Sequence, residues 1–569
     1  MAKIATGNKT QKTSTNLLST SSFKIAGRTF SFTQEEKICS ILMTILILLI
    51  YSIRSKFLLI PFERDEGIYS YMGKLALEGK TPYIDFYEMK FPGLFYFYAS
   101  IVGLFGDTVK GMHTGFMYLN IATILLLYNA GKNLFSPIAG LISAITFAFV
   151  SLTANLSGFT VQAEHGVAFF ISLGLFFYTL TKKSGKWYYF LSMGVALGMA
   201  FMVKTSGVFM PLWGGLILIL DLIFSKKPRQ FKTFFKNLLA YSVGGFSVIA
   251  IFFTVIFFKG SFNEMIYWTY EYSKVYVGGV PFEEGIKYFK YTRDAIVQNY
   301  KFFWVHSVLA VAVCLLRPIS FQLKAFGISL LIFSGLTIVP GFYFYGHYWI
   351  QTLPGISLLA GLTYHCIITV FEPKLKLGKL KLRYIYLSVF AVLTYNHINA
   401  LKSYYFHPNY DLILRQVYGS NPFPEAMEIG NFINANSKPE DNIVLIGSEP
   451  QIYFYTKKKS PSRHAYFTAL VSNVKTHKEW QREFVRDTEK AKPRYVIFFN
   501  NPISLMVQPN TDNYVFEWAN KYITENYTLI GFVDMVDGYT NSNYVWREQI
   551  ATYKQQGKNS ILIYERKSL

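Results

Sequence analysis

Charged side chains are scarce in this chain of 569 residues: Asp, Glu, Lys and Arg together make up 16%, whereas 51% of the residues are hydrophobic. Soluble domains carry about a quarter of their residues as charged side chains. Cysteine is scarcer still, with Cys39, Cys314 and Cys366 far apart and each in or beside an apolar run. The composition therefore argues against a soluble globular protein, a disulfide framework and a cysteine-ligated metal site.

Nucleotide-binding signatures are missing as well. The chain has no G-x-x-x-x-G-K-[ST] loop, and its stretches "GLISAIT" and "GVALGMA" do not follow a strand as a dinucleotide fingerprint would. Acidic residues are the minority, which leaves a net charge of +22. That excess would suggest nucleic acid in a soluble protein. Much of it lies between apolar runs, where membrane insertion and anionic lipid explain it, so we expect no nucleic-acid partner.

Long apolar runs are what the sequence has instead. About eleven lie between residues 38 and 402, most of them near the ~20 residues that an α-helix needs to cross a bilayer. Their basic connections at 182–186, 226–236 and 374–383 all fall inside if the tail 1–37 is cytoplasmic. We therefore expect a polytopic α-helical membrane domain over residues 38–402, with the first run retained as an anchor.

The composition from about residue 403 onward is that of a soluble domain. Short apolar runs at 442–447, 494–499, 527–533 and 561–566 read as strands bounded by turn residues. Helical stretches such as "FPEAMEIGNFINA" alternate with them. Residues 403–569 are therefore expected to form a small α/β domain outside the membrane, on the extracytoplasmic side.

The loop over residues 61–107 carries charge where the first apolar run leaves the predicted membrane. A carboxylate beside hydrocarbon is costly unless it is hydrated, paired or used, and Asp65 and Glu66 stand there. Arg64 and Lys90 could simply pair with them at the interface. Apolar residues recur at helical spacing between Ile68 and Leu75, which predicts an amphipathic helix ending near Gly79.

The same loop carries a recognisable pattern. "RDEGIYSYMGKLALEGKTPYIDFYEMKFPGLFYFYA" resembles the first external loop of the protein O-mannosyltransferase superfamily of GT-C glycosyltransferases, bacterial branch, which is related to the lipid A aminoarabinose transferases. The shared elements are the acidic pair, "G-x-x-P-Y-x-D" at 79–85 and "K-P-P-G" at 90–93, with Phe91 in place of the first proline. Weaker similarities cover 197–207, 346–361 and 447–466.

The resemblance implies a fold and an activity. The fold is a GT-C bundle of about eleven transmembrane helices with a C-terminal extracytoplasmic domain. The activity is transfer of a sugar from a polyprenyl-phosphate donor to an acceptor hydroxyl on a protein, a glycolipid or a glycan. Such an enzyme would lie in a bacterial inner membrane with its site on the outer face. Direct attack by the acceptor hydroxyl on the anomeric carbon would invert that centre.

Roles for the loop residues follow from the resemblance. Asp65 is implied to be the base that takes the proton of the acceptor hydroxyl, and Glu66 is the alternative base or a group that orients the acceptor. Lys90 is the first choice to stabilise the leaving phosphate. Arg64 could bind the same phosphate with its planar fork, or could be an interfacial anchor. Asp85 is a candidate for the acceptor side.

Further candidates lie beyond this loop. Lys204 matches a lysine that the family associates with the donor lipid, although a lysine near the end of an apolar run can also snorkel to the surface. His347 and Tyr348 could hydrogen-bond the phosphate, or Tyr348 could belong to an interfacial aromatic belt. Glu164 and His165 could line the acceptor side or bind a divalent metal. With no third ligand at a recognisable spacing, no metal site is predicted.

Two other functions fit the sequence less well. A transporter or flippase for lipid-linked sugars would show internal repeats, interrupted helices and ionisable residues deep in the bundle. The charges here instead gather at the predicted outer edge. A membrane-tethered binding protein would not need so many spans, and the loop 61–107 would then have no purpose. A lipid-linked donor also suits the missing nucleotide motifs.

Overall fold

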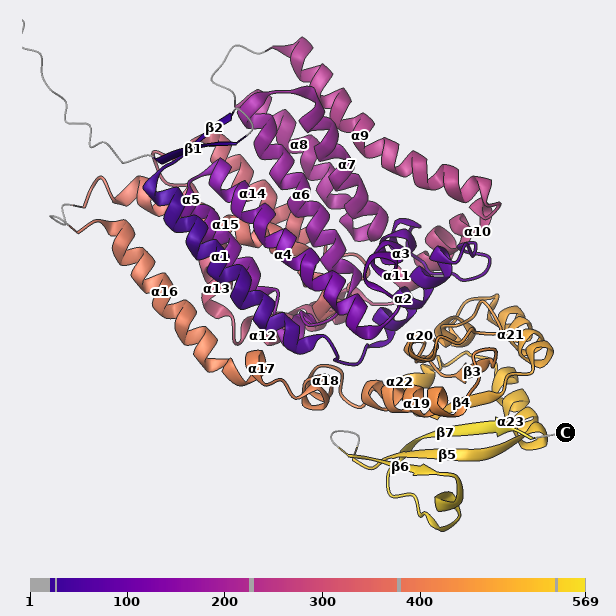
Figure 1. The fold of residues 1–569 in the computed structure, drawn as a ribbon. Coiled ribbons are helices and arrows are strands. Elements are labelled where there is room, and N and C mark those ends of the chain that lie inside the picture. Colours follow the sequence, from indigo (N-terminus) through magenta and orange to yellow (C-terminus); the bar gives the residue numbers. More distant parts are fainter. Residues whose placement is uncertain (1–20, 26–27, 225–229, 376–379, 538–540, 568–569) are drawn as a thin grey trace, which may run out of the picture.

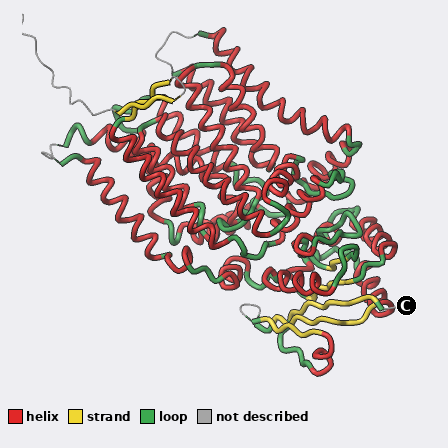
Figure 2. The backbone as a smooth tube through the Cα atoms, in the orientation of Figure 1, coloured by secondary structure: helices red, strands yellow, loops and turns green. Residues whose placement is uncertain are grey.

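The structure is a computed structural model that describes residues 21–25, 28–224, 230–375, 380–537 and 541–567. It consists of a large helical bundle and a smaller domain that contains a sheet (Figures 1 and 2). Most of the expected cytoplasmic tail 1–37, and parts of the basic connections 226–236 and 374–383, lie outside the described residues. The fold class expected from the sequence is confirmed.

Long helices make up the bundle, and a short antiparallel hairpin of β1 (Ser21–Ile25) and β2 (Arg28–Phe32) lies at its end away from the sheet domain (Figure 1). The long helices are α1 (Gln34–Arg54), α4 (Val109–Leu134), α5 (Pro137–Val150), α6 (Ala163–Ser184), α7 (Trp187–Val203), α8 (Phe209–Ile223), α9 (Phe231–Phe258), α13 (Lys301–Cys314), α14 (Phe321–Leu336), α15 (Leu353–Phe371) and α16 (Leu382–Ala400).

Several of these helices can cross a bilayer by length and composition. Within the described residues, five segments meet both criteria, and five further apolar helices are shorter. The five long segments are Gln34–Phe57, Ala163–Ser184, Thr205–Ile223, Phe231–Phe258 and Gly346–Phe371. Apolar side chains also cover the outer surface of the bundle, as lipid contact requires. The expected number of eleven spans stays a prediction.

Local sequence signals start and stop these helices. Thr33 and Glu36 form a capping box at the start of α1, and Thr108 accepts a hydrogen bond from the Gly111 N–H at the start of α4. Gly185 ends α6 with a φ of 66°, a left-handed conformation that favours glycine. The connection from α6 to α7 is therefore tight, and the two helices pack side by side.

Shorter elements gather at the end of the bundle that faces the sheet domain (Figure 1). They include two helices of the first loop, α2 and α3, and several one-turn elements. Their bounds are α2 (Arg64–Leu77), α3 (Gly93–Phe105), η1 (Ser55–Phe57), η2 (Ala154–Leu156), η3 (Thr205–Val208), α10 (Phe262–Ile266), the π-helix η4 (Tyr267–Tyr272), α11 (Ser273–Val277), α12 (Phe282–Val297), η5 (Gly346–Thr352), α17 (Lys402–Phe406) and α18 (Tyr410–Tyr418).

The C-terminal domain is built on a five-stranded sheet of order β3-β4-β7-β5-β6. Strands β3 and β4 pair in parallel, and the other neighbours are antiparallel. The strands are β3 (Ile443–Ile446), β4 (Tyr495–Asn500), β5 (Tyr527–Met535), β6 (Ser542–Trp546) and β7 (Asn559–Arg566). The helices are α19 (Phe423–Asn436), α20 (Gln451–Thr456), η6 (Phe467–Val471), α21 (His477–Ala491), α22 (Pro502–Leu505), α23 (Tyr514–Asn526) and η7 (Arg547–Thr552).

Helix α2 is clamped between the bundle and this domain. A Cβ on Gly73 would lie 2.6 Å from Tyr98 Cβ of α3, and a Cβ on Gly67 would lie 2.5 Å from Gln451 Cα of α20. Distances that short are not tolerated, so glycine is required on both faces for the neighbours to approach. The amphipathic helix expected from the sequence does form, but most of its residues are buried between two packed neighbours.

Candidate functional site

Three carboxylates stand at the first turn of α2, and they differ in environment. Glu63 caps the helix: its Oε1 accepts from the Glu66 N–H at 2.8 Å and from Gln162 Nε2 at 2.6 Å. Glu66 is fully buried, and its Oε1 accepts from the Val161 N–H at 3.1 Å. Asp65 is only half-buried. It is therefore the member of this group that remains open to a substrate.

Burial also favours the protonated forms of Glu63 and Glu66. It raises the pKa of Glu66 to about 8. Burial, together with the neighbouring Asp65 and Glu66 carboxylates, raises the pKa of Glu63 well above its usual range. Both side chains are therefore protonated for the most part at neutral pH. Glu66 is thus a poor base there, whatever its place in the acidic pair.

Lys90 lies in the loop between α2 and α3, with its ammonium turned toward α2. Nζ donates to the Tyr69 hydroxyl at 2.5 Å and to Glu88 Oε1 at 3.1 Å. Burial disfavours the charged form, but the carboxylates of Glu88 and Asp65 outweigh it and hold the pKa of Lys90 above its usual value. The side chain is thus a desolvated cation, the kind that stabilises an anion most strongly.

A second charged group comes from the bundle itself. Lys204, just after α7, forms a buried ion pair with Glu164 in the first turn of α6. Its Nζ also lies 3.6 Å from the ring centroid of Tyr348 in η5, a cation–π contact. His347 Nε2 is 3.8 Å from the same Glu164 oxygen. Residues from three separate segments therefore meet at one end of the bundle.

The two groups form a single electrostatic site. The negative charge of Asp65 favours the protonated forms of Lys90, Lys204 and His347. The negative charge of Glu164 favours the protonated form of Lys90 as well. We call the set Asp65, Lys90, Glu164, Lys204, His347 and Tyr348 the convergent site. Sequence reasoning had selected all six, and the structure brings them together. Their roles stay predictions.

Buried polar contacts hold in place the segment between α5 and α6, which lies behind the convergent site. Arg54, at the end of α1, donates to the carbonyl oxygens of Ser151 and Gly158 at 3.1 and 3.0 Å. These bonds anchor the segment that leads into Val161, whose N–H binds Glu66. The carbonyl of Val161 in turn accepts from the Tyr98 hydroxyl. The polar residues of the first loop therefore share one scaffold with α6.

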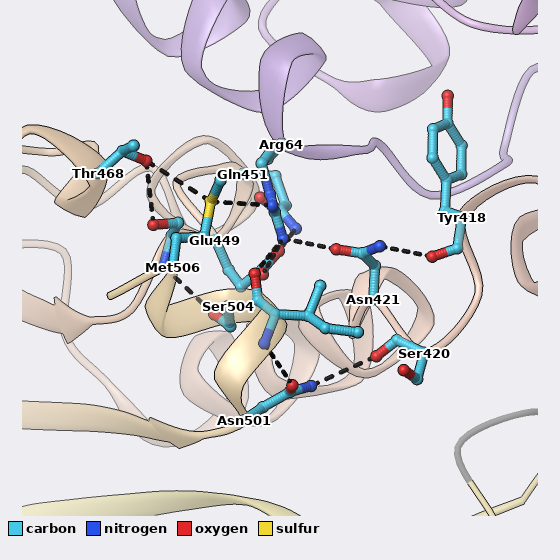
Figure 3. Close-up of polar contacts among 12 residues, drawn as sticks. Arg64, Tyr418, Ser420, Asn421, Glu449, Gln451, Thr468, Asn501, Ser504 and Met506 are labelled. Carbon is cyan, nitrogen blue, oxygen red and sulfur yellow. Dashed lines mark hydrogen bonds and ion pairs between the residues drawn. The ribbon is translucent and has the colours of Figure 1, made fainter. Parts of the chain in front are cut away.

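Three predicted residues lie apart from this site. Arg64 turns toward the C-terminal domain, where its NH2 lies 3.0 Å from Glu449 Oε1 (Figure 3). The His165 ring stands edge-on to Phe116, with 6.3 Å between centroids. Asp85 is exposed, and its Oδ2 accepts from the Thr81 N–H at 2.6 Å.

Asp85 lines a separate cavity of about 280 Å³ between the first loop and the C-terminal domain. Tyr71 of α2 lines the same cavity, whereas Tyr69 binds Lys90. Two helical positions that are two residues apart point about 200° away from each other. The Asp85 cavity and the convergent site therefore lie on different sides of α2.

Sequence reasoning missed several contacts. Tyr69 stands four residues after Asp65, a helical spacing that could have linked it to the site. Glu88 stands two residues before Lys90 and carried only a weak local signal. Tyr276, whose hydroxyl is 3.2 Å from that of Tyr348, and Glu449, the partner of Arg64, carried none. Only the tertiary fold brings such distant residues together.

No group of three or more His, Cys, Asp or Glu side chains suited to a metal ion is present among the described residues. The convergent site instead combines one open carboxylate with two ammonium groups, an imidazole and a phenol. A carboxylate can accept a proton, and two desolvated ammonium groups can neutralise a phosphate. The arrangement is suited to displacing a phosphate with a hydroxyl.

Comparisons with known proteins give a match to a family model over part of the chain and a likeness in fold. Residues 89–258 match the family model described as dolichyl-phosphate-mannose-protein mannosyltransferase. That segment contains Lys90, Glu164 and Lys204, whereas Asp65 and His347 lie outside it. A search of curated proteins gives no match.

Solved structures resemble the whole chain. ArnT from Cupriavidus metallidurans in the apo state matches with a TM-score of 0.52 and 12% identity, over 92% of this chain and 97% of ArnT. The same protein bound to undecaprenyl phosphate matches with a TM-score of 0.50 and 11% identity, over the same shares of the two chains. The chain therefore has the GT-C fold, and its residues 89–258 match the model of the dolichyl-phosphate-mannose-protein mannosyltransferase family.

Proposed function

We propose that this protein is a membrane glycosyltransferase that moves a sugar from a polyprenyl phosphate to an acceptor hydroxyl. The observation that carries the proposal is the convergence of the Asp65 carboxylate with two lysine ammonium groups at one end of an apolar bundle. The similarity to ArnT, solved with undecaprenyl phosphate, supports a lipid phosphate as the leaving group.

Asp65 is assigned as the general base. The acceptor oxygen attacks the anomeric carbon of the sugar, its proton passes to the Asp65 carboxylate, and the bond from that carbon to the phosphate oxygen breaks. The electron pair of the broken bond leaves with the polyprenyl phosphate. One displacement of this kind inverts the anomeric centre, so we propose an inverting enzyme.

Lys90 and Lys204 are assigned to the phosphate. Each ammonium is held by a carboxylate, Glu88 for Lys90 and Glu164 for Lys204. A phosphate entering between them would share these cations and gain charge-assisted hydrogen bonds. His347 and Tyr348 stand beside Lys204 and complete that side of the phosphate site.

The same geometry supports the membrane arrangement that we propose. The convergent site lies at the end of the bundle that carries the C-terminal domain (Figure 1). The basic connection between α6 and α7 lies about 30 Å away, since α6 has 22 residues at about 1.5 Å each. With that connection cytoplasmic, the site faces outward, as we propose for a bacterial inner membrane. The acceptor is then a protein, a glycolipid or a glycan outside the cell.

The test is sugar transfer by the purified full-length protein in detergent, from a panel of radiolabelled polyprenyl-phosphate sugars to membrane extracts. We expect one donor to label an acceptor, and Asp65→Asn to reduce kcat by about 10²- to 10⁴-fold. Binding of undecaprenyl phosphate by Asp65→Asn should stay within about twofold of wild type, because the lysines remain.

Three outcomes would contradict parts of the proposal. Undiminished transfer by Asp65→Asn would remove Asp65 from the chemistry. A product that keeps the anomeric configuration of the donor would exclude a single displacement. Wild-type protein that transfers no sugar, but moves lipid-linked sugar across vesicles, would replace the enzyme with a transporter.

A further inference from the structure

Arg64 inserts its guanidinium into the C-terminal domain and leaves its neighbour Asp65 at the convergent site. Its NH2 donates to Asn421 Oδ1 at 2.6 Å and to Glu449 Oε1 at 3.0 Å, and its NH1 lies 3.2 Å from Met506 Sδ (Figure 3). The guanidinium also lies 5.6 Å from the ring centroid of Phe423. One side chain of the first loop thus contacts several segments of that domain.

The place where Arg64 binds has a defined position in the domain. Glu449 follows strand β3, and α22, which contributes Met506 at its C-cap, follows strand β4. Because β3 and β4 are parallel, these two segments meet at the carboxyl edge of the pair. In α/β sheets, ligands bind at that edge. Here the edge is filled by a residue of the same chain.

Glu449 is built to hold a cation there. Its side chain is fully buried, and its second oxygen accepts from Gln451 Nε2 at 2.8 Å. Burial disfavours the charge on Arg64, but Glu449 outweighs this effect and holds the pKa of Arg64 above its usual value. The two groups therefore form a desolvated ion pair, whose separation would leave a buried charge without its partner.

Asp65, the proposed base, has no side-chain anchor of its own. None of the described residues forms a hydrogen bond or ion pair with the Asp65 carboxylate, so its position follows the backbone of the first turn of α2. That turn is fixed by Arg64 at its start and by the close approach of Gly67 to Gln451. Both of these restraints come from the C-terminal domain, whereas Glu63 and Glu66 tie the same turn to the bundle.

We propose that Glu449 is a positioning residue: it holds Arg64 at the carboxyl edge of the β3–β4 pair and thereby fixes Asp65 against Lys90 and Lys204. The inference deepens the proposed function and rests on it. The C-terminal domain then acts as a part of the catalytic apparatus, whichever acceptor it meets.

The first variant is Glu449→Gln, which keeps the shape of the side chain and removes its charge. We expect kcat to fall by about 10- to 100-fold, because a displacement of about 1 Å at a reacting group can cost that much. The KM for the donor should stay within about twofold of wild type, because Lys90 and Lys204 are unchanged. Amide hydrogen exchange in residues 64–67 should become faster.

The second variant, Arg64→Gln with Glu449→Gln, separates positioning from stability. The single change leaves Arg64 buried and unpaired, so its thermal midpoint should fall, and removing both charges should restore much of that midpoint. Because two neutral amides hold each other less firmly than an ion pair, kcat should stay low. A kcat that recovers together with the midpoint would overturn the proposal, since the pair would then be structural only.

Lys457→Gln is the matched control. It breaks a different ion pair between the same two parts of the chain, Lys457 to Asp107 at 2.8 Å, away from Arg64. We expect wild-type kcat and wild-type exchange at residues 64–67. Equal losses in this variant would mean that any weakening of the interface has the same effect, and would overturn the special role of Glu449.

The exchange measurement is independent of enzymatic turnover. If wild type transferred no sugar from any donor, the proposed function would fail, and the exchange data alone would still show whether Glu449 holds the first turn of α2. Wild-type exchange at residues 64–67 in Glu449→Gln would overturn the inference even if the proposed function held.

Discussion

The negative charge of Glu88 beside Lys90 is expected to affect how tightly Lys90 binds a phosphate. The Lys90 ammonium donates hydrogen bonds to the Tyr69 hydroxyl and to the Glu88 carboxylate. A phosphate that binds Lys90 also meets the negative charge of Glu88. Neutralising Glu88 and removing the ammonium should therefore have opposite effects on phosphate binding.

We expect Lys90→Met to weaken binding of undecaprenyl phosphate by about tenfold or more, and Glu88→Gln to strengthen it several-fold, because a close charge pair in a desolvated site contributes at least ~1.4 kcal/mol. Microscale thermophoresis of the purified protein would measure both. Lys80→Met is the control, since Lys80 lines the Asp85 cavity and should not affect binding. Weaker binding in Glu88→Gln would show that Glu88 orients Lys90 more than it competes for it.

Glu66 should make stability depend on pH in a defined direction. Its pKa rises from an ordinary value of 4.5 to about 8 in the folded protein, chiefly through burial. Below pH 4.5 the group is protonated in both the folded and the unfolded protein. Between pH 4.5 and 8 the unfolded chain releases a proton that the folded chain keeps, so the free energy of unfolding falls by at most ~1.4 kcal/mol per pH unit from this group.

Thermal unfolding in detergent between pH 5 and 8 would measure this dependence. We expect Glu66→Gln to have a shallower loss of stability across that window than wild type. Glu78→Gln, at the exposed end of α2, should keep the wild-type slope. An unchanged slope in Glu66→Gln would mean that other groups account for the pH dependence.

Residues could be selected from the sequence where chemistry and position agreed. Asp65, Lys90 and Lys204 are charged groups at the ends of apolar runs, where an unused charge is costly, and the family resemblance supported them. Such reasoning could not predict the direction in which a side chain points. Adjacent in sequence, Arg64 and Asp65 point to different parts of the molecule because one helical step turns the chain by about 100°.

Among the secondary-structure elements, α2 has the least freedom. Gly67 faces α20 of the C-terminal domain, and Gly73 faces α3 of the bundle. A side chain at Gly67 would force α2 away from α20 and displace Arg64 and Asp65 with it. A methyl group at Gly103 of α3 would do no such harm, because its nearest neighbour there lies at an ordinary contact distance.

We expect Gly67→Ala to lower the thermal midpoint and to reduce transfer by about tenfold or more, because its Cβ would lie 2.5 Å from Gln451 Cα. Gly103→Ala in α3 is the matched control, since its Cβ would lie 3.7 Å from Leu77, an ordinary contact. That change should be neutral or stabilise by about 0.5–1 kcal/mol. Fluorescence-detected unfolding and the transfer assay measure both, and equal effects of the two changes would refute the clamp.

Elements with a strong local pattern were predictable. The apolar runs at 442–447, 494–499, 527–533 and 561–566 correspond to β3, β4, β5 and β7. Strand β6, "SNYVW", was missed because two polar residues begin it and its place at the sheet edge leaves most of it half-buried.

For the whole molecule, the proposed orientation can be tested by labelling single cysteines. The three native cysteines are buried, with at most 2% of their surface exposed, so background labelling should be low. We expect Lys478→Cys, at a side chain that is 60% exposed in the C-terminal domain, to react with an impermeant maleimide in intact spheroplasts. Lys186→Cys, between α6 and α7, should react only after permeabilisation. The reverse pattern would place the site in the cytoplasm.

The overall architecture could be predicted from the sequence because it depends on hydropathy and charge summed over many residues. Hydropathy and the distribution of lysine and arginine predicted a membrane bundle and a separate C-terminal domain, and the fold bears out this class. The contacts between the bundle and the C-terminal domain could not be predicted from the sequence. They are single contacts such as Phe62 N–H to the Tyr455 hydroxyl at 2.7 Å, which no local pattern announces.

The ion pair between Arg64 and Glu449 also bears on when, during synthesis of the chain, the first turn of α2 becomes fixed. The two residues are 385 positions apart, with one in the first loop and the other in the C-terminal domain. A ribosome therefore completes the whole bundle before the partner of Arg64 emerges. Until then the first turn of α2 lacks the restraint from the C-terminal domain, so we expect a chain that ends before Glu449 to transfer sugar poorly if the proposed function holds.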